Sequence, residues 1–173
     1  YNQALVAMAG AERVFRLIDT QPAWEDAPDA VALPKVAGQG ARVEFRKISF
    51  GYDPSRLVLH EVDFVAEPGQ TVALVGHTGS GKTSIINLAA KFYLPTSGEL
   101  FIDGREVRTI TSNSLHRQLG MVPQQNFLFS GTVLANIRLA RPEATEAEVR
   151  AAAQQLDCLD LLEALPLGLH TEV

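Results

Sequence analysis

Residues 76–83 read Gly-His-Thr-Gly-Ser-Gly-Lys-Thr, which fits the phosphate-binding loop pattern G-x-x-x-x-G-K-[ST]. An apolar run, Thr71–Val75, precedes the loop, and an amphipathic stretch, Ser84–Tyr93, follows it. A strand leading into the loop and a helix leading out of it form the setting in which this motif holds phosphates. The pattern therefore constrains this part of the chain to a strand–loop–helix unit and predicts a nucleotide-binding site, rather than a glycine-rich turn without a ligand.

Each residue type in the loop has a physical reason to be there. Gly76, Gly79 and Gly81 allow backbone conformations closed to other residues and let the chain approach the phosphates. Successive amides can then form a concave nest of donors, at which the positive end of the following helix also points. The predicted phosphate-binding residues are Gly76, His77, Thr78, Gly79, Ser80, Gly81, Lys82, Thr83 and Ser84.

Three side chains of the loop have distinct expected roles. Lys82 supplies a full positive charge to the β- and γ-phosphates. The Thr83 hydroxyl is a hard oxygen ligand suited to Mg²⁺. His77 occupies a variable position of the motif, and we interpret it as a loop filler rather than a catalytic base.

Composition narrows the class of protein. At 173 residues, with 46% hydrophobic and 20% charged residues, the chain is long enough for one domain with a real core. Its net charge of −5 gives no electrostatic support for nucleic-acid binding. The single cysteine, Cys158, excludes an internal disulfide and indicates a reducing compartment; a buried hydrophobic role is favoured over a reactive thiol. The sequence has no apolar run of transmembrane length and no secretory signal at its start.

The first 41 residues differ in character from the remainder. Residues 2–19 are expected to form a helix, whose apolar face is made by Leu5, Met8, Ala11, Phe15 and Ile18. That face either packs on its own domain or belongs to the cytoplasmic end of a longer helix cut at Tyr1. Residues 20–41 are expected to be a linker, because regular structure is broken by Pro22, Pro28, Pro34, Gly38 and Gly40.

Apolar spacing and turn residues predict the elements of the globular part, which starts near Arg42. The expected strands are 43–50, 57–66, 71–75 and 99–102, and the expected helices are 84–93, 112–119, 145–156 and a stretch reaching Leu165. Pro95 is expected to end the first of these helices and Gly120 the second. Thr145 and Glu148 have the spacing of a capping box. Turns are expected at 51–54, 68–69, 95–98 and 103–104, and a short extended segment at 121–123.

Ordered markers around the loop carry a resemblance to a known family. They are Ala11-Glu12-Arg13-Val14-Phe15, Phe50-Gly51-Tyr52, Pro95–Gly104, Val122-Pro123-Gln124 and Phe127–Ile137. Together with the loop they resemble the nucleotide-binding domain of an ABC transporter, of the exporter type in which membrane and ATPase parts share one chain. The resemblance covers essentially all 173 residues.

The resemblance implies a fold and a set of site residues. The fold would be α/β, a P-loop NTPase of the ABC ATPase type, with a RecA-like core and an N-terminal antiparallel β subdomain. Tyr52 would stack on the adenine of ATP, a contact worth about 1–3 kcal/mol by analogy with base stacking in nucleic-acid binders. Gln124 would act with Lys82 in catalysis, and would coordinate Mg²⁺ together with Thr83 or orient the attacking water. The implied cofactors are ATP and Mg²⁺.

The same resemblance implies an organisation and partners. Residues 1–19 would end the last transmembrane helix, 20–41 would be a linker, and 42–173 would be the N-terminal part of the nucleotide-binding domain. The partners would be ATP, the membrane domain of the same parent chain and a second nucleotide-binding domain, with no nucleic acid. The location would be the cytoplasmic face of the plasma or inner membrane.

The sequence also departs from the family pattern. It holds no LSGGQ signature and no apolar strand ending in Asp-Glu, and none of His60, His116 and His170 sits in a switch-histidine segment. The sequence begins with Tyr1 rather than Met, and residues 171–173 resemble the approach to the signature, so both ends are interpreted as cuts. Because positioning and electrostatics supply nearly all of phosphoryl-transfer catalysis, we expect these 173 residues alone to bind MgATP weakly without hydrolysing it.

Three other hypotheses remain open. A soluble ABC ATPase acting on DNA or in translation is opposed by the N-terminal helix and linker, by residues 127–137 and by the acidic charge. A small-molecule kinase would need acceptor and lid residues that the sequence does not offer. A non-catalytic ATP-sensing or interaction module would require the chain to end naturally where it does.

Overall fold

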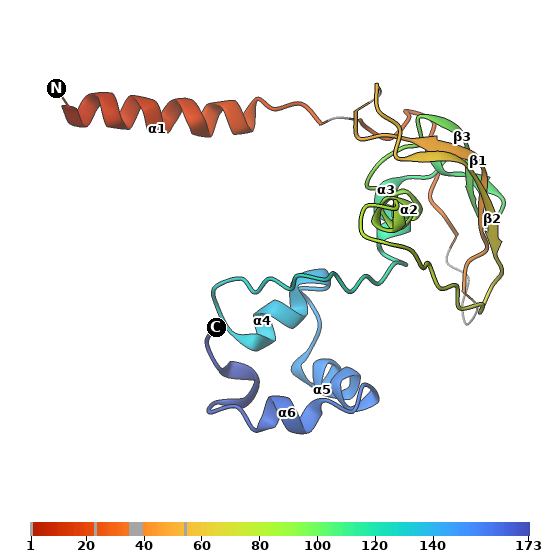
Figure 1. Ribbon diagram of the computed structural model, residues 1–173. Helices are drawn as coiled ribbons and strands as arrows, with labels where there is room; N and C mark the ends of the chain where they lie inside the picture. Colours follow the sequence, from red (N-terminus) through yellow and green to blue (C-terminus); the bar gives the residue numbers. More distant parts are fainter. Residues whose placement is uncertain (1, 23, 35–39, 54) are drawn as a thin grey trace. The chain divides into compact units, whose positions relative to one another are not determined.

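The computed structural model describes residues 2–22, 24–34, 40–53 and 55–173, with side chains described from Met8 onward (Figure 1). Gly38 of the expected linker, Pro54 of the expected turn and the side chain of Leu5 lie outside this description. The chain divides into two compact units, residues 1–120 and 121–173, and each is described by itself.

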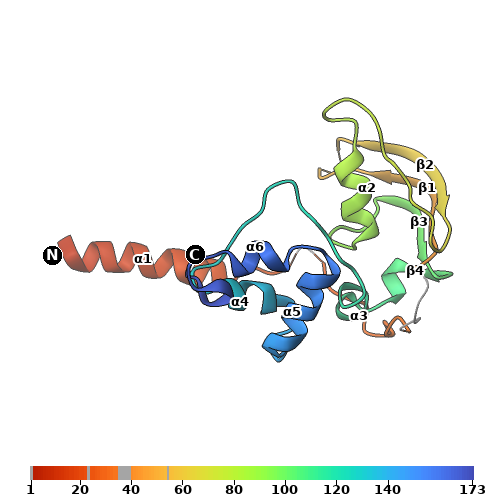
Figure 2. The same cartoon turned by 90° about the horizontal axis from the view of Figure 1, so that it is seen from below.

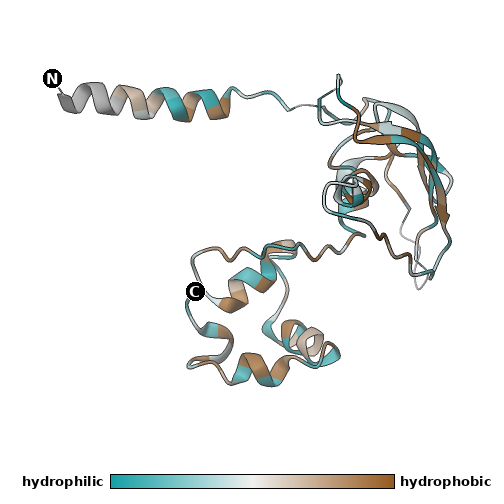
Figure 3. Ribbon diagram, in the orientation of Figure 1, coloured by the Kyte–Doolittle hydropathy of each residue, from teal (hydrophilic) through white to brown (hydrophobic). Residues whose placement is uncertain are grey.

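The first unit contains a four-stranded antiparallel sheet. Its strands are β1 (Val43–Phe50), β2 (Leu59–Ala66), β3 (Ser97–Ile102) and β4 (Arg105–Glu106), in the order β2-β1-β3-β4. Hydrophobic residues recur along these strands (Figure 3). In the central strand Phe45 faces Phe64 on one side and Leu100 on the other. The expected strands at 43–50 and 99–102 are confirmed, and the second strand begins two residues later than expected.

Helices α2 (Lys82–Ala89) and α3 (Ser112–His116) pack on one face of this sheet (Figures 1 and 2). Leu88 of α2 and Leu115 of α3 join the sheet residues in one hydrophobic core, since apolar residues of all three elements face inward. The buried members of that core are Leu33, Phe45, Ile48, Phe50, Leu59, Leu88, Leu100, Ile102, Val107, Ile110 and Leu115. Packing against the sheet therefore fixes the position of the helix that follows the phosphate loop.

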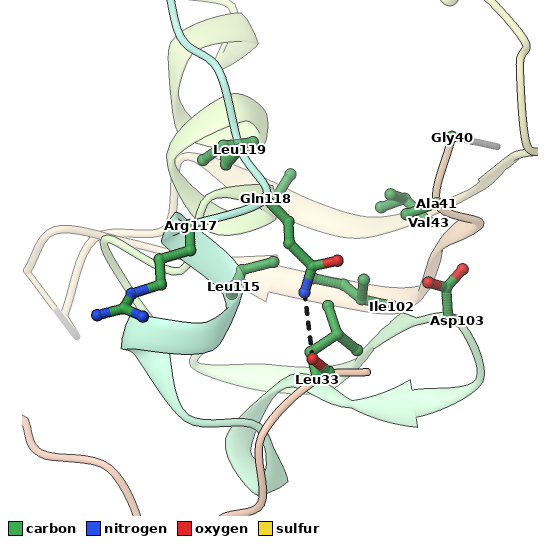
Figure 4. A pocket seen from close by; sticks show the side chains of 11 residues that line it. Leu33, Gly40, Ala41, Val43, Ile102, Asp103, Leu115, Arg117, Gln118 and Leu119 are labelled. Atoms are coloured by element: carbon green, nitrogen blue, oxygen red, sulfur yellow. Dashed lines mark hydrogen bonds between the residues drawn. The ribbon is translucent and has the colours of Figure 1, made fainter. Parts of the chain in front are cut away.

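Residues 24–33 of the expected linker segment pack against this core. Asp26 accepts hydrogen bonds from Lys91 Nζ at 2.7 Å and from the backbone N of Ser112 at 2.8 Å, so it caps the first turn of α3. Leu33 is buried; its backbone N donates to Ser114 Oγ and its carbonyl accepts from Gln118 Nε2 at 3.1 Å (Figure 4). The segment is thus held by Lys91, just beyond α2, and by residues of α3 and the turn that follows it.

Three expectations about local elements are wrong. Residues 71–75 form no strand, and the Val75 side chain is 89% exposed. A strand is defined by hydrogen bonds to a neighbour, and no strand among the described residues pairs with this segment.

The two helix ends also differ from expectation. Helix α2 ends at Ala89, well before Pro95, because Lys91 takes a left-handed conformation with φ of 55° that stops the helix. Helix α3 ends at His116 rather than beside Gly120, and the turn that follows it runs to Gln118. Gly120 does not cap it, since Gly120 is not among the glycines with positive φ.

Helix α1 spans Asn2–Ile18, as expected. Its apolar side chains Met8, Phe15 and Ile18 are 62–69% exposed, so nothing in the described chain covers that face. None of the described helices combines the length and apolar character needed to cross a membrane.

The second unit is helical. It contains α4 (Val133–Ile137), α5 (Glu146–Gln155) and α6 (Leu159–Glu163), around a small core of Leu134, Val149 and Leu169. Short 3₁₀ turns lie at 138–140 and 168–170, and a further one in the first unit at 107–109. Cys158 is half-buried, rather than buried as expected, and its Sγ donates to the carbonyl of Ala153 at 3.5 Å.

The capping box at the start of α5 is confirmed. Thr145 Oγ1 accepts from the backbone N of Glu148 at 3.2 Å, and Glu148 Oε2 accepts from the backbone N of Thr145 at 2.7 Å. The hydrogen bonds that the Glu148 carboxylate accepts from the backbone N and the hydroxyl of Thr145 hold the pKa of Glu148 below its ordinary value.

Replacing Thr145 with alanine should destabilise α5 by about 1 kcal/mol, because it removes the cap of an N-terminal amide. Amide hydrogen exchange would show this as faster exchange throughout α5. Thr145→Ser is the matched control, since it keeps the hydroxyl. If Thr145→Ser speeds exchange as much as Thr145→Ala, the hydrogen bond is not the stabilising feature.

Candidate nucleotide-binding site

The phosphate loop has the backbone geometry its glycines were expected to supply. Gly79 and Gly81 have φ of 86° and 88°, in the left-handed region that favours glycine. A Cβ on Gly81 would also come within 2.5 Å of Leu59 Cδ2, so this residue allows the loop to approach β2. Gly81 is the N-cap of α2, which places the start of that helix directly at the end of the loop.

Lys82 lies over the loop and is held by the loop's own oxygens. Its Nζ donates to the carbonyls of Gly76 and His77, both at 2.8 Å, and to Ser80 Oγ at 3.4 Å. The ammonium group is therefore located at the loop by three of the loop's own oxygens. An anionic phosphate placed there would meet this charge together with the positive end of α2.

Neighbouring loop side chains have simpler surroundings. Thr83 is exposed in the first turn of α2, so its hydroxyl is open to a ligand. No acidic residue lies in that turn to oppose an anion. His77 is exposed, and its Nδ1 pairs with the Thr78 carbonyl at 2.9 Å; as the carbonyl accepts, Nδ1 donates. That hydrogen bond occupies one ring nitrogen inside the loop, which fits a loop filler.

Tyr52 lies beside the phosphate-loop helix. Its Oη is 3.2 Å from Ser84 Oγ and accepts from Asn87 Nδ2 at 3.3 Å. Its side chain is 52% exposed, which leaves ring surface open to a planar ligand. The structure therefore brings Tyr52 together with Ser84, two residues predicted separately.

The turn that carries Tyr52 is shaped by its neighbours. A Cβ on Gly51 would lie 2.3 Å from the carbonyl oxygen of Arg56, so only glycine fits there. Asp53 Oδ1 accepts from Ser55 Oγ at 2.7 Å and from the Ser55 backbone N at 2.8 Å. These hydrogen bonds lower the pKa of Asp53, keep it ionised and close the turn.

Gln124 lies in the second unit, in an exposed segment. Its proposed role at the nucleotide remains a prediction. In the same unit, Asn136 holds the preceding segment by accepting from the Phe129 backbone N at 2.7 Å and donating to the Phe129 carbonyl at 2.8 Å. Asn136 of α4 thus closes the loop that runs from Phe129 into this helix.

Two residues near the site were not predicted from the sequence. Asn87 and Tyr93 both contact Tyr52, Tyr93 with its ring centroid 5.0 Å away at an interplanar angle of 88°. A signal for Asn87 did exist: it follows Ser84 by three residues, and residues three apart share a helix face. Tyr93 lies beyond the end of α2, where helical spacing gives no guidance.

A hollow of about 310 Å³ in the first unit is separate from this site (Figure 4). It is lined by Leu33, Gly40, Ala41, Val43, Ala89, Ile102, Asp103, Leu115, Arg117, Gln118 and Leu119. None of the predicted nucleotide-binding residues borders it. The candidate site is instead the exposed phosphate loop, with Tyr52 beside the helix that follows it.

Comparison with known proteins places this chain in a family. Residues 59–169 match the family described as ABC transporter. A fatty acid ABC transporter ATP-binding/permease protein of Mycobacterium tuberculosis is 40% identical over 173 residues, which cover 100% of this chain and 27% of that protein. The β-(1→2)glucan export ATP-binding/permease protein NdvA of Bradyrhizobium diazoefficiens is 42% identical over 162 residues, 94% of this chain and 26% of that protein.

A solved structure is also similar. It is a bacterial Atm1-family ABC exporter with ATP bound, with a TM-score of 0.81 and 41% identity, covering 99% of this chain and 29% of that chain. The chain thus spans less than a third of the length of the relatives it matches.

Proposed function

The chain belongs to the ABC transporter family, and on that premise we propose that it is the ATP-binding part of an exporter that couples ATP hydrolysis to transport across a membrane. It has the ABC ATPase fold of the P-loop NTPases, represented here by the antiparallel sheet, α2 and the helical unit. The observation that carries the proposal is the phosphate loop, with Lys82 Nζ held over it by loop oxygens and Tyr52 fastened beside it.

In this proposal each residue has a stated task. The amides of residues 79–84 and the Lys82 ammonium group bind the phosphates, and the Thr83 hydroxyl binds Mg²⁺. Tyr52 stacks on the adenine, and Gln124 coordinates Mg²⁺ or orients the attacking water. Bound MgATP supplies the phosphoryl group that hydrolysis transfers to water. The donors fit that ligand, because they are backbone amides, one cation and one hard oxygen, with no acid in the first turn of α2.

The proposed organisation follows the family resemblance. Residues 1–19 form the end of the last membrane helix, 20–41 the linker and 42–173 the N-terminal part of the nucleotide-binding domain. The partners are the membrane domain of the parent chain and a second nucleotide-binding domain, at the cytoplasmic face of the membrane. The exposed apolar face of α1 supports this, since a helix that continues into a membrane domain would have that face covered there.

The 173-residue chain by itself should bind MgATP weakly and show no measurable hydrolysis. It carries the phosphate loop and Tyr52 but no LSGGQ segment, no strand ending in Asp-Glu and no switch histidine. Titration calorimetry with MgATP, and with ATP in EDTA, would measure the binding, and phosphate release would measure turnover. Absence of any binding would contradict the nucleotide site. Steady hydrolysis would contradict the assignment of catalysis to groups outside these residues.

A further inference from the structure

Tyr52 is held from several sides by the first unit. The Tyr52 ring meets Tyr93 and Phe50 edge to face, each with a centroid distance of 5.0 Å and with interplanar angles of 88° and 77°. Its hydroxyl is bonded to Asn87 Nδ2 at 3.3 Å and to Ser84 Oγ at 3.2 Å. Because Asn87 donates to the phenol oxygen, the phenol hydrogen is free to donate to Ser84. Both the plane and the far end of the ring are therefore fixed.

Two of the four residues that hold Tyr52 come from α2. Ser84 and Asn87 lie on successive turns of this helix, whose first residues are Lys82 and Thr83. Phe50 is 3% exposed and belongs to β1, so the Tyr52 ring packs against a side chain that is itself fixed in the core. A base-stacking side chain on a loop is thus tied to the helix that carries the phosphate-binding groups.

We propose that Asn87 and Tyr93 are positioning residues, which hold the Tyr52 ring in the orientation that stacks on a nucleobase. They act through Tyr52 and not by touching the nucleotide. Fixing a side chain in its bound conformation beforehand strengthens binding, because less rotational freedom is lost when the ligand arrives. This inference rests on the proposed function. It makes the contribution of the base to ATP affinity depend on two residues outside the phosphate loop, which act through Tyr52.

The proposal separates two parts of the affinity. Contacts to phosphate run through the loop amides and Lys82, whereas contacts to the base run through Tyr52. Loss of the Asn87 or Tyr93 side chain should therefore weaken the binding of ATP and leave the binding of inorganic tripolyphosphate unchanged. A purely structural role for these residues would weaken both ligands together, since it would disturb α2 as a whole.

The experiment compares magnesium complexes of ATP and tripolyphosphate binding to the complete protein. Asn87→Ala and Tyr93→Leu should each weaken ATP by between about twofold and tenfold, the range expected for one hydrogen bond or one aromatic pair. Tyr93→Phe should behave like the unaltered protein, because the edge contact remains. Ile86→Ala is the matched control, as Ile86 is on α2 and 48% exposed, whereas the hydrogen bonds to Tyr52 come from Ser84 and Asn87.

Tyr52→Phe tests the same hydrogen bonds without altering α2. It keeps the ring and removes the hydroxyl, and with it the hydrogen bonds to both Asn87 and Ser84, so it should weaken ATP binding at least as much as Asn87→Ala does. In a Tyr52→Ala background, Asn87→Ala should have no further effect, because the two residues act as a unit. Equal weakening of ATP and tripolyphosphate, or a full additional loss in that background, would overturn the inference alone. If the unaltered protein binds neither ligand, the proposed function fails and the inference fails with it.

Discussion

The complete protein should lose at least about 100-fold in ATP turnover when Lys82 is replaced by alanine. One preorganised donor removed from a developing negative charge costs a factor of this order, and Lys82 adds a full charge. Its Nζ is now shared by the carbonyls of Gly76 and His77, both at 2.8 Å, so it is already located at the loop. Phosphate release and nucleotide binding by the purified protein would measure the loss.

Two controls test whether the loss of turnover comes only from a change in net charge or from a loss of stability. Arg105→Ala removes one positive charge at an exposed position of β4, outside the loop, and should leave turnover unchanged. The melting temperature of the Lys82→Ala protein should stay close to that of the unaltered protein, since the lysine bonds only an exposed loop. A variant that is stable and still hydrolyses ATP at more than a small fraction of the normal rate would rule out the assigned role.

Local sequence patterns were enough to predict the elements that are stabilised by residues close together in the sequence. The phosphate loop, α2 and the Thr145–Glu148 capping box each depend on residues a few positions apart, and all are present. The apolar residues of 71–75 predicted a strand that does not form, because a strand needs a partner and none of the described strands pairs with this segment. The end of α2 was missed because it is set by the backbone of Lys91 and not by Pro95.

The candidate site shows the same division. Lys82 meets oxygens that lie two to six residues away, so the motif alone places it. The contact between Tyr52 and Asn87 joins residues 35 apart, and the sequence marks neither as the partner of the other. Tyr52 itself was found only through resemblance to the family. Long-range contacts of this kind depend on tertiary packing, which could not be inferred from the sequence.

Another group of long-range contacts surrounds Lys91. This side chain is only 1% exposed, and its ammonium group donates to Asp26 Oδ1 at 2.7 Å and to the carbonyl of Ile110. It also lies 5.2 Å from the centroid of the Trp24 ring, a cation–π contact. A buried charge is tolerated because these partners replace its water.

Asp26→Ala should therefore cost about 3–5 kcal/mol in the free energy of unfolding of the first unit, since it leaves the Lys91 charge buried without its counter-ion. Adding Lys91→Met should recover most of the loss, because the unpaired charge is then gone. Urea denaturation followed by the fluorescence of Trp24, the only tryptophan, would report on this unit directly. Additive losses in the double variant would contradict the pairing.

The same pair gives an acid-dependent stability with a defined sign. Burial alone would raise the pKa of Asp26, but the hydrogen bonds from Lys91 and Ser112 outweigh it and lower the pKa from 3.8 to about 2. A carboxyl group whose pKa is lower in the folded state stabilises the fold above its unfolded pKa, and that contribution is lost as the pH falls through the folded value. The carboxylate should thus contribute up to about 2 kcal/mol to the free energy of unfolding above pH 4, and this contribution should fall away between about pH 4 and pH 2.

Urea denaturation across that window should show a steeper loss of stability in the unaltered protein than in the double variant Asp26→Ala, Lys91→Met. Equal slopes would mean that Asp26 is not the group being titrated.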